Sequence, residues 1–145
     1  MSNQTKKSKF QFGETPDTFK RNVDVINIHG AESTIEFEFI YRTKKQFAAL
    51  ADEGLRASKE KALAEKDKGE DSFLIENISP NFYSEMNEKT SKEGAEYVMK
   101  IVKTWDISNP LSVENLIKLE DECAGALQTI ATVYAKAINE VRTKN

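Results

Sequence analysis

The chain has 145 residues, of which 39% are hydrophobic and 31% charged, and it carries a formal net charge of −3. This length predicts one domain with a single core, and the many aromatic and branched aliphatic residues argue against a disordered chain. The mild negative charge argues against a general nucleic-acid binder, which needs a concentrated basic face.

Three further features concern the compartment in which the protein acts. The only cysteine, Cys123, excludes a disulfide within the chain and fits a reducing cytoplasm. No run of about 18 apolar residues occurs, so we expect no membrane span. Met1–Lys9 contains lysines but no apolar stretch follows it, unlike in a secretory signal. We therefore expect a cytoplasmic protein.

The N-terminal residues 1–18 are mostly polar and predict a mobile tail. Phe10 and Phe12 have the spacing of one strand face, so this pair could instead dock on a sheet edge. Both alternatives stay open at this point.

Residues 19–42 predict a β-hairpin. The stretch Thr34–Tyr41 alternates apolar and polar residues, which places its aromatic side chains on one face and its carboxylates in water. A second β-branched stretch, Val23–Ile28, changes parity after Val25, so either both faces are partly covered or a bulge redirects the strand. The segment His29–Ser33 is predicted to be the connecting loop.

Residues 43–68 predict a charged helix. Thr43 is a suitable N-cap, and an apolar stripe runs along the first turns as far as Leu55. Beyond Leu55 the residues are mostly charged, with both signs mixed, and Gly69 is a natural stop. This helix either meets a partner or simply presents a solvated surface.

Residues 80–145 predict a helical bundle. An apolar connection, Ser72–Tyr83, contains Ser79 and Pro80, which can start a helical turn, and a polar span follows it. From Glu93 onward, helical spacing predicts a helix that ends at Trp105, through the stripe Val98, Ile101, Val102 and Trp105.

The return segment begins with several agreeing helix signals. Ser112 is placed as an N-cap, Glu114 lies in the first turn, and Leu111 and Leu116 occupy the two positions of a hydrophobic staple. Helical spacing continues to the C-terminus, with a possible break into two segments at Gly125. The predicted fold is therefore α+β: an N-terminal antiparallel hairpin or small sheet packed on about four helices, with a predominantly helical C-terminal half.

Candidate reactive residues are few. His29 lies in the predicted turn without a metal-ligand partner, and Cys123 lies on the inner face of a helix, where a small buried hydrophobe is expected. Glu36 and Glu38 share one strand face, where solubility explains them. The sequence contains no phosphate-binding glycine loop, serine elbow or zinc-ligand pair. We predict no catalytic residue, no metal and no cofactor, and therefore not an enzyme.

Trp105 and Asp106 form a separate candidate. An indole at the end of an apolar stripe usually anchors a helix end in the core, while the carboxylate bonds to the backbone that follows it. The alternative is that Trp105 binds a partner.

Several segments resemble the tail assembly chaperones of long-tailed bacteriophages and prophages. Thr34–Leu50 resembles the strand-to-helix segment of that family, and Ile101–Ile107 is similar to its tryptophan–aspartate turn. The ending from Leu111 to Asn145 is also similar, so the resemblance covers about residues 20 to 145. The chain departs from the family in the long charged segment Arg56–Asp71 and in Cys123–Gly125, where similar proteins have a proline-led helix start.

The resemblance implies a chaperone that binds the tape-measure protein, keeps it soluble in the host cytoplasm, and leaves as tail-tube subunits polymerise. It also implies self-association into rings or spirals and absence from the mature particle. The alternatives are a structural tail or connector component of a phage virion and, third, an enzyme or small regulator. No membrane and no nucleic acid are expected as partners. The residues proposed to contact a partner are Phe37, Phe39, Tyr41, Leu55, Trp105 and Tyr134.

Overall fold

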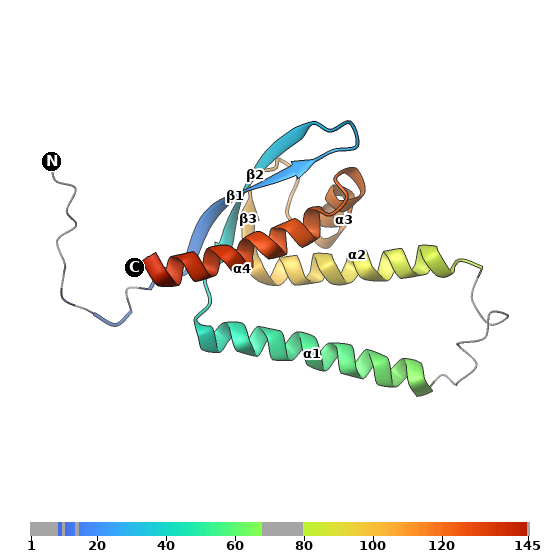
Figure 1. The fold of residues 1–145 in the computed structure, drawn as a ribbon, viewed down its shortest axis with the longest axis horizontal. Coiled ribbons are helices and arrows are strands. Elements are labelled where there is room, and N and C mark those ends of the chain that lie inside the picture. Colours follow the sequence, from blue (N-terminus) through green and yellow to red (C-terminus); the bar gives the residue numbers. More distant parts are fainter. Residues whose placement is uncertain (1–8, 10, 14, 68–79, 145) are drawn as a thin grey trace.

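The computed structural model describes residues 9, 11–13, 15–67 and 80–144. Over these residues a three-stranded sheet and four helices confirm the predicted α+β class. Figure 1 shows the sheet with the helices on one side of it and the first helix standing apart below. The elements are β1 (Thr18–Ile26), β2 (Glu32–Ile40), α1 (Lys44–Asp67), α2 (Phe82–Ile101), β3 (Val102–Trp105), α3 (Val113–Glu122) and α4 (Ala126–Lys144).

The first two strands form the predicted hairpin. They pair antiparallel from Thr18 opposite Ile40 to Ile26 opposite Glu32, with no shift in register. The bulge considered for this strand is therefore wrong, and Ile26 simply lies on the open face with 54% of its surface exposed. The turn comes earlier than predicted because the Asn27 side chain accepts the backbone N–H groups of His29 and Ala31, which lets β2 begin at Glu32.

The third strand corrects a prediction. Val102–Trp105 was expected to end a helix, but α2 ends at Ile101 and β3 pairs antiparallel with β2. β-branched and aromatic residues favour a strand, and the open edge of β2 supplies hydrogen-bond partners. The register shifts between Glu38 and Phe39, so Lys103 is the extra residue of a bulge. This bulge lets Val102 and Trp105 both face the core, which mimics helical spacing in the sequence.

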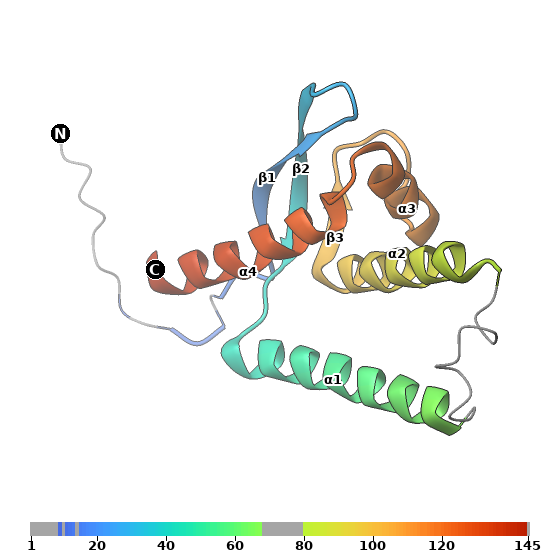
Figure 2. The same ribbon diagram turned by 45° about the vertical axis from the view of Figure 1, so that its right-hand side comes forward.

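The core lies between one face of the sheet and the helices α2 and α4 (Figure 2). Its largest fully buried side chains include Phe37, Phe39 and Tyr134. The opposite face of the sheet is polar, as the alternation of β2 predicts. There the Thr18 hydroxyl donates to Glu38 at 2.6 Å.

The helical ends follow their local signals. The Ser112 side chain accepts the backbone N–H of Asn115 at 3.1 Å, which confirms it as the N-cap of α3. Gly125 has φ +90° and separates α3 from α4, as predicted. The carboxylate of Glu120 accepts the N–H groups of Gly125 and Leu127, so it caps the start of α4, a role that no sequence pattern had indicated.

The second helix is longer than predicted. It begins at Phe82 rather than Glu93, because its polar first half is rich in helix-forming residues and lies in solvent rather than against the core. The mobile tail proposed for residues 1–18 stays a prediction, since residues 1–8, 10 and 14 lie outside the described residues, although Thr18 already belongs to β1. The predicted stop at Gly69 and the residues up to Ser79 of the apolar connection also lie outside them.

None of the helices in the described part of the chain combines the length and hydropathy that crossing a membrane requires.

Candidate partner-binding surface

Four of the six proposed partner-contacting residues lie in the core. Phe37, Phe39 and Tyr134 are fully buried, and Trp105 is 9% exposed. Their rings pack on one another, with 5.4 Å between the centroids of Phe39 and Tyr134 and 6.1 Å between those of Phe37 and Trp105. In this conformation the rings of Phe37, Phe39 and Tyr134 are not accessible to a partner.

Trp105 and Asp106 hold β3 in place. The Trp105 indole Nε1 donates to the carbonyl of Asn109 at 2.8 Å. The Asp106 carboxylate accepts the backbone N–H of Glu36, and the Asp106 N–H donates to the Glu36 carbonyl, both at 3.1 Å. Asp106 therefore bonds to β2 rather than to the backbone that follows it, which corrects the prediction. The pair acts as an anchor of the sheet.

A second polar network fixes the connection from β2 into α1. The Arg42 guanidinium donates to the carbonyl of Lys100 at 2.7 Å and to the Tyr134 hydroxyl at 3.3 Å. That hydroxyl donates to the carbonyl of Ile40 at 2.9 Å. From the end of α4, Arg142 donates to the carbonyl of Arg42 at 2.9 Å. The start of α1 is thereby tied to α2, α4 and the sheet.

The first helix leaves the core after two turns. Thr43 and Gln46 form a reciprocal capping box, in which each side chain bonds to the backbone N–H of the other residue. Phe47 is half-buried and Leu50 is buried, whereas every residue from Ala51 to Ala64 is exposed. Most of α1 therefore projects from the body of the protein.

Two ion pairs connect this projecting part to α2. Lys100 lies 2.6 Å from Glu53, and Lys61 lies 2.5 Å from Glu93. The hydrogen bond from Lys100, reinforced by its charge, holds the pKa of Glu53 below its ordinary value. Both pairs are exposed to water, where such contacts stabilise a fold by little.

The first half of α2 projects in the same way. All residues from Phe82 to Thr90 are exposed, and the buried stripe of this helix begins only at Ser91. We call residues 51–64 of α1 together with residues 82–90 of α2 the helical arm. Figure 1 shows the two helices running beside each other away from the sheet.

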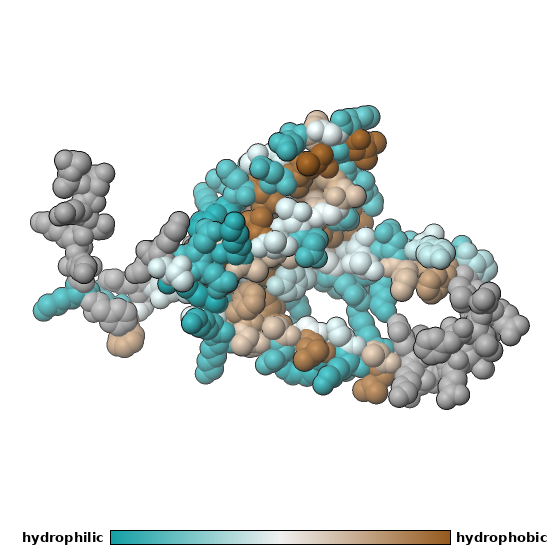
Figure 3. Space-filling model, in the orientation of Figure 1, coloured by the Kyte–Doolittle hydropathy of each residue, from teal (hydrophilic) through white to brown (hydrophobic). Residues whose placement is uncertain are grey.

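Large apolar side chains are exposed along the helical arm, on both helices. Tyr83 is 84% exposed, and its ring packs against that of Phe82 with 5.4 Å between their centroids. Figure 3 shows hydrophobic groups on both helices and open space between them. Exposed apolar side chains are candidates for contact with a partner. Those of the helical arm are Leu55, Leu63, Phe82, Tyr83 and Met86.

Only Leu55 of this group had been proposed from the sequence, and its side chain is 58% exposed. Tyr41, the sixth proposed residue, is half-buried beside the core. For Leu63 and Tyr83 the sequence held no signal, and for Phe82 and Met86 it held only a helical stripe. Phe82 and Met86 fall on the same helical stripe as Glu93 and Lys100, the two residues that pair with α1. The early start of α2 had to be recognised before that stripe could be seen.

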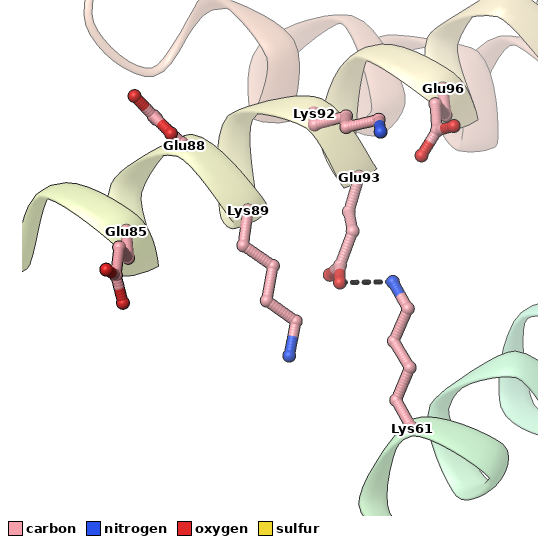
Figure 4. Close-up of a pocket in the computed structure, with 7 residues that line it drawn as sticks. All are labelled: Lys61, Glu85, Glu88, Lys89, Lys92, Glu93 and Glu96. Carbon is pink, nitrogen blue, oxygen red and sulfur yellow. Dashed lines mark hydrogen bonds and ion pairs between the residues drawn. The ribbon is translucent and has the colours of Figure 1, made fainter. Parts of the chain in front are cut away.

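A hollow lies between the two helices near the end of the arm (Figure 4). Amines and carboxylates line it in nearly equal numbers, and Lys61 reaches Glu93 across it. The lining residues are Lys61, Glu85, Glu88, Lys89, Lys92, Glu93 and Glu96.

The residues considered for chemistry have ordinary surroundings. His29 is exposed in the hairpin turn, Cys123 is half-buried at the end of α3, and Glu36 lies near Lys20 on the polar face of the sheet. Across the residues that the structure describes, no three side chains of His, Cys, Asp or Glu are grouped so as to hold a metal ion.

A comparison with models of protein families gave a match. The model of a family described as phage tail assembly chaperone matches residues 6–145, nearly the whole chain. No curated protein and no solved structure matches the chain.

Proposed function

Because the chain belongs to the phage tail assembly chaperone family, we propose that it binds the tape-measure protein in the host cytoplasm. It keeps that long protein soluble and departs as tail-tube subunits assemble around it. The activity is binding, with no covalent step, and the protein is missing from the finished particle.

The exposed apolar side chains of the helical arm support this proposal. Leu55, Leu63, Tyr83 and Met86 are each more than half exposed, and they extend from a body whose own core is closed. A chaperone needs accessible apolar surface on a protein that itself stays soluble, and the alternating charges between α1 and α2 supply the polar surroundings.

The strength of the contact also suits a temporary partner. Full burial of one large apolar side chain contributes roughly 1.5–3 kcal/mol. Association costs roughly 4–15 kcal/mol in lost freedom of motion. A handful of partly buried side chains therefore leaves modest affinity, which tube subunits that bind the tape-measure protein more tightly can overcome by mass action.

Co-expression with the tape-measure protein of the same genome tests the proposal. We expect the two proteins to co-purify and the tape-measure protein to stay in the soluble fraction. Replacing Tyr83 and Met86 by serine removes apolar surface from the arm. It should therefore reduce both the amount of complex that co-purifies and the amount of tape-measure protein in the soluble fraction. Ile28→Ser is the matched control, since Ile28 is 82% exposed at the hairpin tip, away from the arm.

Two results would refute the proposal. One is a tape-measure protein whose solubility does not change with co-expression and that forms no complex. The other is detection of this chain in purified mature particles by mass spectrometry, which would instead indicate a structural tail component.

A further inference from the structure

We propose that the edge strand β1 pairs with β1 of a second copy of this chain. The two strands run antiparallel about a twofold axis at Asn22 and join the two sheets into one. This interface uses a surface distinct from the helical arm and does not depend on the proposed function.

The strand order β1-β2-β3 leaves one side of β1 without a strand. Two hydrogen bonds at the ends of the hairpin fix which residues face that side. The Tyr41 N–H donates to the Asp17 carbonyl at 2.9 Å, and the Asn27 N–H donates to the Ala31 carbonyl at 3.0 Å. Hydrogen-bonded pairs alternate along an antiparallel ladder, so the odd-numbered residues of β1 bond to β2.

The even-numbered residues of β1 therefore direct their N–H and C=O groups outward. Among the described residues, none bonds to the outward backbone groups of Asn22, Asp24 or Ile26. The carbonyl of Lys20 accepts the guanidinium of Arg21 at 2.8 Å, and that guanidinium has to move aside when a strand docks. A row of unpaired backbone groups is a template for another strand.

The sequence of β1 selects a second copy as the occupant. Asn22 is the midpoint of Thr18–Ile26, so antiparallel pairing about Asn22 uses the strand over its whole length. This register places Lys20 opposite Asp24 of the other copy, and the twofold axis repeats the pair. Opposite charges across a pair of strands are favourable, and like charges are unfavourable.

Neighbouring registers lose this match. Centring the pair at Arg21 or Val23 separates Lys20 from Asp24 of the other copy. Centring it at Asp24 brings two carboxylates together, and centring it at Lys20 brings two amines together. All four slipped pairings also shorten the overlap. The charges on the edge of β1 therefore favour the pairing centred at Asn22 over the slipped ones.

The faces of the joined sheet are compatible with this arrangement. Thr18, Lys20, Asn22 and Asp24 all lie on the polar face, so pairing extends that face without burying a charge in a core. Ile26, which is 54% exposed, comes to lie opposite Thr18 of the other copy. The helix α4 lies across the other face of the sheet, as Figure 2 shows.

Analytical ultracentrifugation over a range of concentrations, with charge-exchanged variants, tests the interface. The wild type is expected to form a species of twice the mass of one chain. Lys20→Glu or Asp24→Lys alone should weaken the dimer by about tenfold, because each places like charges opposite each other at two positions. The double variant Lys20→Glu/Asp24→Lys restores opposite charges and should restore the dimer. Lys45→Glu on α1 makes the same change in net charge as Lys20→Glu, and it should leave the dimer unchanged.

A backbone variant tests the pairing itself. Asn22→Pro removes an outward N–H at the centre of the interface while leaving the β1–β2 ladder intact, so it should abolish the dimer. Asn22→Ser is its control, and circular dichroism establishes that each variant is folded. A wild type that stays monomeric would overturn the inference. So would a dimer that survives both Lys20→Glu and Asn22→Pro in folded protein. Failure of tape-measure binding would leave these results unchanged, so the two proposals can fail separately.

Discussion

The sheet with its covering helices and the helical arm use the same residue types in opposite ways. In the sheet region, Phe39 and Tyr134 are fully buried and contact each other. In the arm, Tyr83 is 84% exposed and Met86 is 54% exposed. Aromatic and aliphatic residues therefore stabilise the fold in one region and remain available for contact in the other.

The difference lies in how each region is held together. Hydrogen bonds, ring contacts and apolar packing all converge on Tyr134, whereas the projecting part of α1 is connected to α2 by the exposed ion pairs at Glu53 and Lys61. A closed core can carry an arm that is weakly bound to it, because the arm contributes little to the stability of the whole. Such a division suits a protein that must stay folded while its contact surface adapts to a partner.

Truncating one aromatic residue in each region should give the largest contrast. Phe39→Ala should lower the free energy of unfolding by about 3–5 kcal/mol, because it leaves a cavity in the core. Tyr83→Ala should change it by no more than about 0.5 kcal/mol, because the side chain is exposed. Urea unfolding followed by circular dichroism measures both values. A large loss on truncating Tyr83 would show that the arm is part of the cooperative core.

Removing a single oxygen atom should have a smaller effect on the sheet region. Tyr134→Phe keeps the ring but leaves the Ile40 carbonyl without its 2.9 Å donor and the Arg42 guanidinium with one partner fewer. An unsatisfied buried group costs about 1–3 kcal/mol, and this carbonyl is partly buried. The free energy of unfolding should therefore fall by an amount near the lower end of that range. Tyr83→Phe is the matched control in the arm, and unchanged stability of Tyr134→Phe would contradict the role assigned to this network.

The sequence correctly predicted the hairpin, the cap at Ser112 and the break at Gly125, because each of these features depends on residues that are close together in the chain. It missed β3 because the bulge at Lys103 makes a strand resemble the end of a helix. Phe37 and Tyr134 were proposed as contact residues, but both are fully buried. The pattern of apolar residues in a sequence does not reveal whether another element covers them. Sequence reasoning missed Phe82 and Met86 because exposure at the end of a helix depends on how far the neighbouring elements extend, which is a property of the whole fold.

The N-caps of α1 and α3 allow the arm and the core region to be compared through the same chemical change. Ser112→Ala and Thr43→Ala each remove one side-chain acceptor, and each loss is worth about 1 kcal/mol. In α3, which packs on the core, the loss should lower the stability of the whole protein. In α1 it should mainly speed amide hydrogen exchange along that helix. If both substitutions lowered global stability equally, α1 would unfold together with the body.

Acidification should give the smallest effect, and only in the arm. The pKa of Glu53 is lowered in the folded protein by the hydrogen bond and charge of Lys100, so the favourable contribution is present above the ordinary pKa of a glutamate. It is lost as the pH falls through the lowered pKa, where Glu53 takes up a proton. Because Glu53 is exposed to water, global stability should hardly follow this titration. The separation between α1 and α2 should follow it instead, measured as the distance between spin labels on Ala57 and Lys92. In Glu53→Gln the distance should be independent of pH over the same range, and an equal pH response in that variant would assign the effect to other groups.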